Sequence, residues 1–404
     1  MMQLIKLAFR NISRNKRRSI LSALAVALGL ALLLMMASIV RGEMQGALAT
    51  SIKLSSGDLQ VRSSSYVEAK TSLKWSDLVI NPDEVAAQIK ALPQVLEATP
   101  RLFATGIVTV GDTSTGVKLL GLDPLSTAST PYSDGMVSGT FLASDDQSGI
   151  LIGKGLADKL KVAVGDQLAL YANTSNGDVA QQKFTIRGIF STQTPGIDDT
   201  TVLLPLAKAQ ALTQTTNHAS TIFVLLKDRD QSGVVAASIN TPGYQVLTWQ
   251  GMNEVIIQTE QFANAYMFLM YLIVLGVTAT VIVNTLVMAV YERTREIGIL
   301  AAIGMKGRRI MTLFLTEASL LAAGGIVVGL ILGVLICLYL EKFGIYIGDI
   351  GATGFLVGER IYAELNVNDA FMLTIVALIV TLVASLYPAI TAARLEPVEA
   401  LHGK

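Results

Sequence analysis

Residues Ser19 to Val40 read SILSALAVALGLALLLMMASIV and contain no charged side chain. As an α-helix this stretch would be about 33 Å long, which is enough to cross the hydrocarbon core of a bilayer. A cleaved signal peptide is the alternative, but its apolar core would be shorter, and no small-x-small cleavage site follows here. We therefore expect residues 19–40 to form an uncleaved membrane span.

Three further stretches of the same kind follow a long polar region, residues 44–260. They cover residues 262–290, 310–340 and 370–393, and Glu317 is the single charged residue among them. The composition of the whole chain agrees, since 51% of it is hydrophobic and only 15% is charged, whereas soluble domains carry about 25% charge. The sequence predicts an α-helical membrane protein with four spans and a large domain between the first and the second.

Basic residues flank the four spans unevenly. Residues 1–18 hold six basic residues and no acid, and residues 291–309 hold five basic residues against two acids. Residues 341–369 hold two basic residues against five acids. Because basic loops stay on the cytoplasmic side, we expect both ends and the 291–309 loop inside, and the large domain and the 341–369 loop outside. Residues 394–404 then form a cytoplasmic tail.

The N-terminal segment has its own pattern. Apolar residues recur at helical spacing among the basic ones: Leu4, Ile5, Ala8, Phe9 and Ile12. This pattern is typical of an amphipathic helix that lies in the membrane interface. A disordered basic start is the alternative, and the regular apolar face argues against it.

The large domain, residues 44–260, has an α+β pattern. A strand near Asp58–Arg62, a helix after Pro82 and strands over 95–110 and 115–122 come first. A second set follows His218, with strands over 221–226 and 244–248 on either side of a helix near 232–239. These two β-α-β units predict one split subdomain. The segment between them, about 125–217, predicts an inserted, mainly β subdomain with a hairpin at Asn176-Gly177.

The sequence argues against an enzyme and against a nucleic-acid binder. Asp198-Asp199 reads as a solvated loop, because adjacent side chains on a strand point to opposite faces. His218 has no Ser or Cys partner in a recognisable motif, and Gly149–Gly155 lacks the spacing and the Ser/Thr of a phosphate loop. Two histidines and one cysteine exclude a His/Cys metal cluster, and 31 basic against 31 acidic residues exclude a large basic surface. We expect no catalytic residue, metal or cofactor in this chain.

Residues Tyr291 to Arg309 read YERTREIGILAAIGMKGRR. Charged residues come first and the apolar residues Ile297, Ile299, Leu300 and Ile303 follow, so the segment predicts a short helix that ends at Gly304 and docks on a cytosolic partner. An ordinary positive-inside loop is the alternative, but it would not need this ordered pattern. The residues assigned to this docking role are Glu292, Arg293, Arg295, Glu296, Ile297, Gly298, Leu300 and Gly304.

The third and fourth spans carry features that need an explanation. Gly325, Gly329 and Gly333 recur every four residues and predict close helix contact, within the chain or across a dimer. Glu317 is an intramembrane acid, and we expect it to have a structural role with Arg308, Arg309 or a partner's backbone nearby. A proton relay is the alternative, but no second buried acid supports it. Pro388 predicts a kink near the inner end of the fourth span.

These motifs together resemble the permease subunits of the FtsX-like/MacB-like class of ABC transporters, and the resemblance covers nearly the whole chain. The resemblance rests on four segments: the basic segment 7–18, the pattern ERxREIGILxAxG over 292–304, Glu317-Ala318 with the glycine-spaced helix, and the C-terminal residues 387–401. In this class 291–304 corresponds to the coupling helix.

The resemblance implies a half-transporter that works as a homodimer or heterodimer in the bacterial inner membrane. A separate cytosolic ABC ATPase dimer would bind ATP and magnesium and dock on the coupling helix. The spans would then move the outer domains without passing a substrate through a pore, a mode called mechanotransmission.

Within the class, length and span plan look closest to the lipoprotein-releasing, Lol-type permeases. Similar segments are Gly153–Ala157, Val164–Asp166, Phe184–Phe190 and Ile197–Asp199. The hairpin between Leu170 and Phe184 is shorter than the hook by which one Lol permease recruits its periplasmic carrier, and it lacks proline. Three explanations stay open: the other permease of a pair, a homodimer that serves both roles, or a relative with another cargo.

Release of a lipoprotein or another amphiphile is therefore the leading hypothesis, with a periplasmic carrier or adaptor as a further candidate partner. Peptide or drug efflux through an adaptor is the second hypothesis, and transmission of motion to an envelope hydrolase or sensor is the third. The candidate contacts for acyl chains are Leu34, Met35, Ile39, Met267 and Met270, because they are apolar and adaptable. Contact with membrane lipids or helix packing is the alternative role for these residues.

Overall fold

The computed structural model describes residues 2–14, 16–67, 70–239, 241–346 and 360–395. The chain divides into two units. The membrane unit comprises residues 1–44, 259–345 and 361–404, and the large domain comprises residues 45–258 with 346–360. Residues 347–359 of the loop expected over 341–369, and the C-terminal signature from residue 396 onward, lie outside the described residues.

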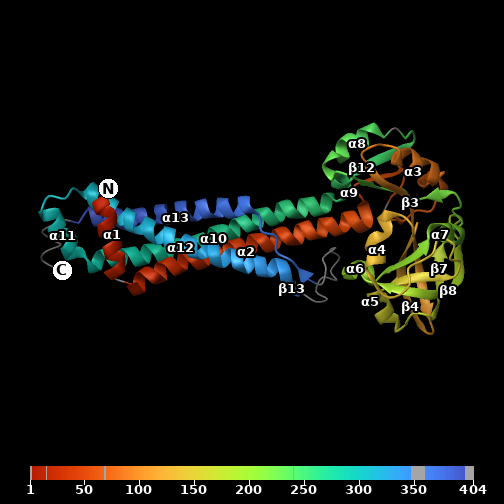
Figure 1. The fold of residues 1–404 in the computed structure, drawn as a ribbon, viewed down its shortest axis with the longest axis horizontal. Coiled ribbons are helices and arrows are strands. Elements are labelled where there is room, and N and C mark those ends of the chain that lie inside the picture. Colours follow the sequence, from red (N-terminus) through yellow and green to blue (C-terminus); the bar gives the residue numbers. More distant parts are fainter. Residues whose placement is uncertain (1, 15, 68–69, 240, 347–359, 396–404) are drawn as a thin grey trace. The chain divides into compact units, whose positions relative to one another are not determined.

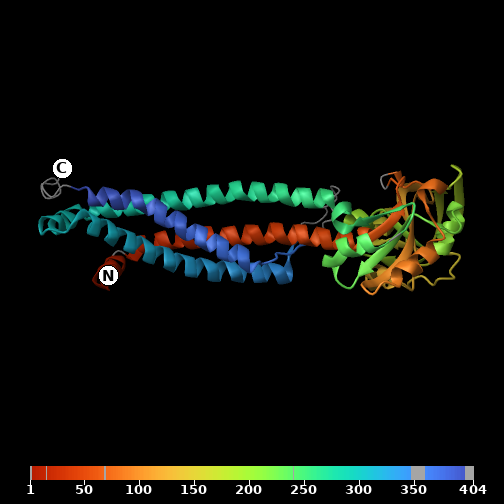
Figure 2. The same cartoon turned by 90° about the horizontal axis from the view of Figure 1, so that it is seen from above.

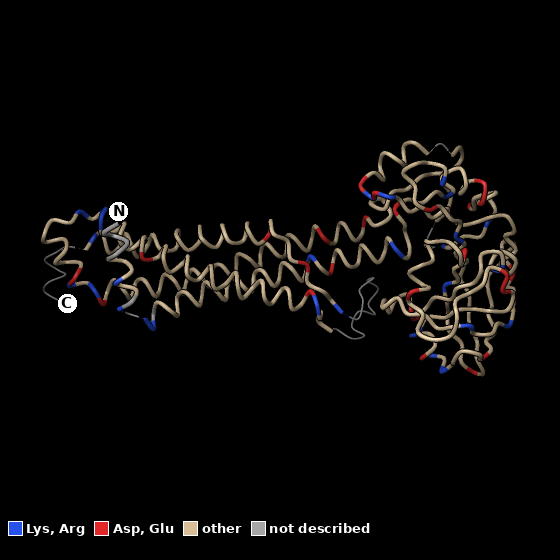
Figure 3. The backbone as a smooth tube through the Cα atoms, viewed as in Figure 1, with Lys and Arg blue, Asp and Glu red and all other residues tan. Residues whose placement is uncertain are grey.

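Four long helices contain the four uncharged stretches. They are α2 (Lys16–Ser51), α10 (Glu254–Glu292), α12 (Gly307–Phe343) and α13 (Val367–Ala393), and each is apolar and long enough to cross a membrane. Their membrane portions run side by side (Figures 1 and 2) and carry few charges along most of their length (Figure 3). At 1.5 Å per residue, α2 and α10 are about 54 and 58 Å long, against about 30 Å of hydrocarbon core. Both helices therefore continue well beyond the membrane.

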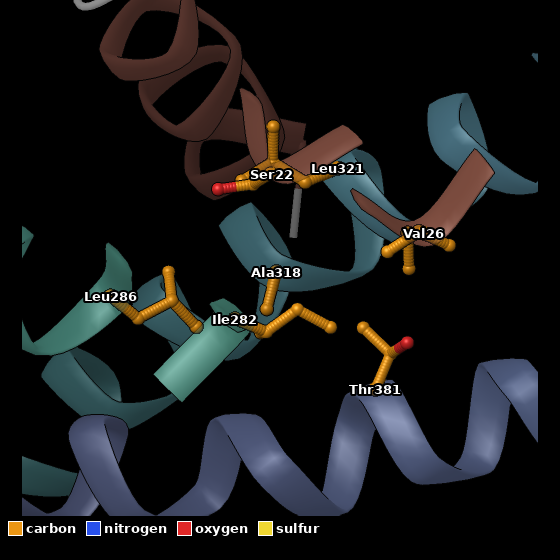
Figure 4. A pocket seen from close by; sticks show the side chains of 8 residues that line it. Ser22, Val26, Ile282, Leu286, Ala318, Leu321 and Thr381 are labelled. Carbon is orange, nitrogen blue, oxygen red and sulfur yellow. The ribbon is translucent and has the colours of Figure 1, made fainter. Parts of the chain in front are cut away.

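Apolar side chains from all four helices form the core of the membrane unit. Val26 and Leu30 of α2 pack with Ile282 of α10, Ala318 of α12 and Ala377 of α13. A cavity of about 10 Å³ remains between the helices, and Figure 4 shows the side chains of α2, α10, α12 and α13 that line it. This volume is about that of one water molecule, so the cavity is too small to hold a solute.

The three spaced glycines of α12 lie against α2. A Cβ atom at Gly325 would be 2.7 Å from the carbonyl oxygen of Ala23, and one at Gly329 would be 2.7 Å from that of Ala27. A Cβ atom at Gly333 would be 2.8 Å from Leu34 Cδ1. Glycine is therefore required at this contact, because any side chain would push the two helices apart.

The N-terminal helix and the short helix of the 291–309 segment lie at the same end of the bundle. Helix α1 (Met2–Arg14) packs against α12, and α11 (Thr294–Ala302) follows directly after α10 (Figure 1). Helix α2 begins at Lys16, so the last basic residues of the expected 1–18 segment belong to the membrane helix. Helix α13 is helical on both sides of Pro388.

The large domain is built on one sheet with the strand order β12-β1-β11-β3-β4-β9-β6-β8-β5, and β7 pairs with β3 and β8. The bounds of these strands are β1 Leu59–Ser63, β3 Val95–Val110, β4 Thr113–Leu122, β5 Met136–Gly139, β6 Gly149–Gly153, β7 Gln167–Asn173, β8 Val179–Phe190, β9 Thr201–Pro205, β11 Thr221–Leu226 and β12 Tyr244–Thr248. The strand pairs β2 (Val79–Ile80) with β10 (His218–Ala219), and β13 (Ile345–Tyr346) with β14 (Arg360–Ile361), form two small sheets.

The first and last parts of the large domain share one hydrophobic core. Strand β1 lies between β12 and β11, and β11 pairs with β3. Ile89 of α3 (Pro82–Lys90) and Val235 of α8 (Ser232–Ser238) pack on this part of the sheet. Segments more than a hundred residues apart in sequence thus build one layer of helices on four strands.

The central segment forms a second core. The pairings run from β3 through β4, β9, β6, β8 and β7 and return to β3, so these strands close a ring. Leu102, Val117, Ile152, Phe184 and Val202 lie within its core, covered by α5 (Lys154–Leu160) and α7 (Leu206–Thr213). Residues from the second half of β3 and from β4 join this core, earlier in the chain than the boundary near residue 125 expected from the sequence. Leu120 and Leu122 of β4 belong to a third cluster, with Leu54, Tyr132 and Phe190.

Candidate coupling site

Helix α11 has a defined end. The backbone N–H of Gly304 donates to the carbonyl of Ala301, and that of Met305 donates to the carbonyl of Leu300, both at 3.0 Å. Gly304 has a φ of +97°. This combination is the Schellman motif, in which a glycine in the left-handed region closes the helix. The helix thus ends immediately before Gly304, as the sequence predicts.

One face of α11 is anchored in the membrane unit. Ile297 is buried with Ile310 and Phe314 of α12 and with Ala389 and Ala392 of α13. Gly298 is also buried, and Leu300 is half-buried. The expectation that Ile297 docks on a partner is therefore wrong, because this side chain fills the chain's own core.

The opposite face of α11 is open. Glu292, Arg295, Glu296 and Ile299 are exposed, and Ile303 at the end of the helix has 80% of its surface accessible. Charged groups beside two exposed isoleucines form a surface that a partner protein can cover. Of the eight residues assigned to docking, Arg295 and Glu296 are exposed on α11 and Leu300 is half-buried there, while the exposed Glu292 ends α10 and the exposed Gly304 follows α11.

Arg293 and Glu317 form a buried ion pair at the base of α11. Arg293 Nη1 lies 3.4 Å from Glu317 Oε2, and the side chains are only 5% and 3% exposed. Arg293 Nη2 donates to the carbonyl of Asn11 in α1 at 3.1 Å. The sequence led us to expect Arg308 or Arg309 beside Glu317. Arg293 pairs with Glu317 because its side chain is buried, whereas Arg308 and Arg309 are exposed. Arg293 consequently joins α1, α11 and α12 and has no surface for a partner.

Another arginine, Arg14 of α1, forms an ion pair on the exposed face of α11. Arg14 Nη2 donates to both carboxylate oxygens of Glu296, at 2.7 and 2.8 Å. Both side chains are about half exposed, 53% and 54%. The hydrogen bond and the charge of Glu296 raise the pKa of Arg14, so the guanidinium stays protonated. This contact could not be predicted from sequence patterns, because 282 residues separate the two partners.

The five candidate acyl-chain contacts do not share one environment. Leu34 lies in the core of the membrane unit against Gly333, so its proposed role in contacting cargo is wrong. Met35, Ile39 and Met270 are half-buried, and Met267 is buried.

Met267 lines a cavity of about 60 Å³ whose wall also contains Arg41, Tyr271 and Asp369. Arg41 Nη2 donates to Asp369 Oδ2 at 2.6 Å, so an ion pair between α2 and α13 borders this cavity. Met267 is thus adaptable apolar surface next to a polar wall.

The residues considered for catalysis have structural roles. Asp198 is buried at the end of α6 (Pro195–Asp198) and accepts hydrogen bonds from the hydroxyls of Ser191 and Thr192, at 2.7 and 2.8 Å. It is therefore not the solvated loop residue expected from the sequence. Asp199 pairs with Lys159 at 2.7 Å. His218 is buried with its ring edge against Trp75, and its Nδ1 lies 2.9 Å from the carbonyl of Thr216.

Comparisons with known proteins agree with this architecture. Residues 19–241, more than half of the chain, match the family described as MacB-like periplasmic core domain, and residues 268–397 match FtsX-like permease C-terminal. The lipoprotein-releasing system transmembrane protein LolE of Haemophilus influenzae is 26% identical over 94% of this chain and 93% of its own length. LolC of Neisseria meningitidis is 22% identical over 76% and 78% of the two chains.

A solved structure of the periplasmic region of MacB from Actinobacillus actinomycetemcomitans covers 52% of this chain and 97% of its own, with a TM-score of 0.36 and 12% identity. The family assignment rests on the sequence matches to both halves of the chain. The chain therefore belongs to the FtsX-like/MacB-like family of ABC transporter permeases, with a MacB-like periplasmic core domain between its first two membrane helices.

Proposed function

We propose that this chain is a permease subunit that converts ATP-driven movement of a separate cytosolic ATPase into movement of its large domain, and thereby releases lipoproteins from the outer leaflet of the bacterial inner membrane. It would act as a dimer with a second permease subunit. ATP and magnesium would be bound by the ATPase.

The observation that carries the coupling part of the proposal is the two-sided environment of α11. Its exposed face presents Arg295, Glu296 and Ile299, while Ile297 is locked between α12 and α13. The Arg293–Glu317 ion pair adds a polar link to α12. A push on the exposed face would pass to the membrane helices, because the buried face of α11 packs directly on α12 and α13.

The length of α2 and α10 supports transmission to the other side. Each helix is continuous across the membrane stretch and carries the chain from the membrane unit into the large domain. This continuity supports mechanical transmission from the membrane unit to the large domain.

We favour lipoproteins as the cargo because the relative LolE, named for lipoprotein release, aligns along almost its entire length. The β7–β8 hairpin bears on whether this chain is the Lol-type subunit that recruits a periplasmic carrier. Its tip is tied down, since the backbone N–H of Ser175 donates to the carbonyl of Thr213 at 2.9 Å and Asn176 Nδ2 donates to Gln214 Oε1 at 2.8 Å. A tip bound to α7 is poorly suited to hook a carrier, so we assign carrier recruitment to another subunit.

The test is to isolate the full-length tagged chain from native membranes in mild detergent and identify the proteins that accompany it. We expect a cytosolic ATPase and a bound lipoprotein. Arg295→Glu should lose the ATPase, whereas the matched charge reversal Lys342→Glu, which leaves α11 unchanged, should keep it. An ATPase with an adaptor or hydrolase and no lipoprotein would overturn the cargo, and absence of any ATPase would overturn the permease assignment.

A further inference from the structure

Helix α2 ends inside the large domain in a π-helical turn, Ile52–Ser56. The backbone N–H of Gly57 closes this turn by donating to the carbonyl of Ile52 at 2.8 Å. Gly57 has a φ of +64°, and a Cβ atom there would be 2.9 Å from the carbonyl oxygen of Val224. The helix must therefore stop at this point, and its last carbonyl groups lack partners within the helix.

Arg101 caps this helix end from the middle of the large domain. Its side chain is fully buried, Nη1 donates to the carbonyl of Leu54 at 2.8 Å, and Nη2 donates to the carbonyl of Ala128 at 2.8 Å. The guanidinium also lies 3.5 Å from the ring centroid of Phe223. A cation at a helix C-terminus is favoured by the partial negative charge of the free carbonyls.

The burial of Arg101 is unusual in that no carboxylate accompanies it among the described residues. Burial lowers the pKa of Arg101 to about 10, so the side chain is still charged at neutral pH. A buried charge costs several kcal/mol of desolvation, and apolar replacements for buried charges often leave a protein equally stable. A gain in stability is therefore a weak explanation for an arginine at this position. A stronger explanation is that its guanidinium holds three elements in a fixed geometry.

The three groups that Arg101 contacts come from different parts of the domain. Leu54 belongs to the end of α2, Phe223 to β11, the strand that also carries Ile222 and Val224 of the first core, and Ala128 to the turn that leads into the central segment. Arg101 itself lies on β3 between Ala98 of the first core and Leu102 of the second. One side chain thus joins the end of a membrane helix to strand β11 and to the turn at Ala128.

Asn253 makes the corresponding link between α2 and α10. It directly precedes α10, and its backbone carbonyl accepts from Ile257 at 3.0 Å. Its side-chain oxygen accepts from the hydroxyl of Ser51, and its Nδ2 donates to Ser56 Oγ at 3.1 Å. Asn253 is buried. The end of α2 and the start of α10 are therefore cross-linked by a single amide.

We propose that Arg101 and Asn253 form a transmission joint, in which Asn253 makes the ends of α2 and α10 move together and Arg101 passes that movement to strand β11 and to the turn at Ala128 in the large domain. The two are positioning residues, since neither lies where cargo or ATP would bind in the proposed function. This inference rests on the proposed function, because it presumes that α2 and α10 move during the ATPase cycle.

The test measures movement directly and does not depend on the cargo. Spin labels are placed at Val234→Cys on α8 and Val367→Cys at the start of α13, which are 73% and 78% exposed, in a Cys337→Ala background. The full chain with its co-purifying ATPase is studied in nanodiscs by pulsed electron resonance, without nucleotide and with ATP and vanadate.

We expect the wild-type label distance to shift with nucleotide, and we expect Asn253→Ala and Arg101→Met to lose most of that shift while still binding the ATPase. Thr213→Val is the matched control, because Thr213 is a buried polar residue of α7 outside the joint. It should keep the full shift. Tryptophan emission, which comes only from the large domain, checks that each variant is folded.

Full shifts in the folded joint variants would overturn the joint and leave the proposed function standing. If Arg101→Met unfolds, the label distances of Asn253→Ala and Ser56→Ala test the joint instead. Each of these two variants removes hydrogen bonds but no buried charge. If the wild-type chain itself shows no shift, the proposed function fails, and the joint fails with it. The two failures are thus told apart by the wild-type measurement.

Discussion

Two arginine–glutamate pairs hold α11, and they differ in burial. Arg293–Glu317 is almost fully buried, whereas Arg14–Glu296 is about half exposed. An exposed ion pair gains little, because water screens the charges and two flexible side chains must be ordered. A buried pair depends on both partners, because the loss of one leaves a charge without compensation. The same interaction type should therefore have different consequences at the two positions.

We predict that Arg293→Ala destabilises the membrane unit strongly, by about 3–5 kcal/mol, because it removes a buried charge partner of the Glu317 carboxylate. Arg14→Ala should cost at most about 1 kcal/mol. Thermal unfolding of both variants in the same detergent compares them. Equal losses of stability in the two variants would contradict the account.

Asp146 should make the stability of the large domain depend on acid. Burial raises the pKa of Asp146, but hydrogen bonds from the backbone of Ser148 and Gly149 and from Arg187 outweigh it, so the pKa is lower than usual. A carboxyl whose folded pKa is depressed stabilises the fold above its unfolded pKa of about 3.9. That contribution is lost as the pH falls through the lower, folded value.

We therefore predict that unfolding of the wild-type chain shows an acid-dependent component below about pH 4 that Asp146→Asn lacks. Both tryptophans, Trp75 and Trp249, lie in the large domain, so their emission reports on this unit alone. Melting curves between neutral pH and strong acid give the comparison. Identical pH profiles for the two chains would show that Asp146 has no such role.

Among the elements, the contact between α12 and α2 depends on small residues. A Cβ atom at Gly329 would lie 2.7 Å from the carbonyl of Ala27, whereas one at Gly324 would have no neighbour within 4 Å. We predict that Gly329→Leu lowers the melting temperature of the membrane unit markedly, while Gly324→Leu leaves it nearly unchanged. Gly324→Leu, on the same helix but without close neighbours, is the control for added apolar volume alone. A similar fall in melting temperature for both variants would contradict the contact between α12 and α2.

Helix α11 should couple ATP hydrolysis to movement only when its end and its exposed face are intact. Gly304→Pro removes an N–H that closes the helix and excludes a φ of +97°. Glu296→Lys removes the partner of Arg14. We predict that both variants insert into the membrane but lose transport. Retained ATP-stimulated transport in these variants would refute the role of residues 291–304.

A charge swap separates two roles for Glu296. If its main task is to bind Arg14, the double variant Arg14→Glu with Glu296→Arg should restore transport that Glu296→Lys abolishes. If Glu296 binds the ATPase, the swap should remain inactive, because the surface charge presented to the partner is reversed. Transport rates for the single and double variants, at equal protein levels, decide between the two roles.

The elements were largely predictable because their signals are local. The uncharged stretches 19–40 and 370–393 are long enough to specify helices, and the strand at Thr221–Leu226 has the predicted bounds. Gly304 gave the end of α11 correctly, since a glycine in the left-handed region needs no distant partner.

The contacts between elements were less predictable, because they join residues far apart in sequence. Glu317 was correctly singled out, but its partner Arg293 depends on how the loop turns back on α12. Leu34 is apolar, as a cargo contact would be, but one helix in isolation does not reveal that its neighbours cover this face. Arg101 gave no signal at all: an arginine in a strand reads as exposed, and only the end of α2 explains its burial.

At the scale of the whole molecule, α2 and α10 each contribute residues to both the membrane unit and the large domain. The family match applies to both parts of the chain. The proposed cargo follows from the similarity to LolE along the chain, and not from any single site. The cargo therefore needs a test that follows the lipoprotein itself.

The most direct measurement is lipoprotein release from proteoliposomes that contain the chain, its second permease subunit if one co-purifies, and its ATPase. A labelled triacylated lipoprotein is incorporated, and its transfer to a soluble acceptor is followed with ATP and with a non-hydrolysable analogue. We predict transfer only with ATP, and none with Gly304→Pro. ATP hydrolysis at a normal rate with no transfer of any lipoprotein tested would contradict the central claim.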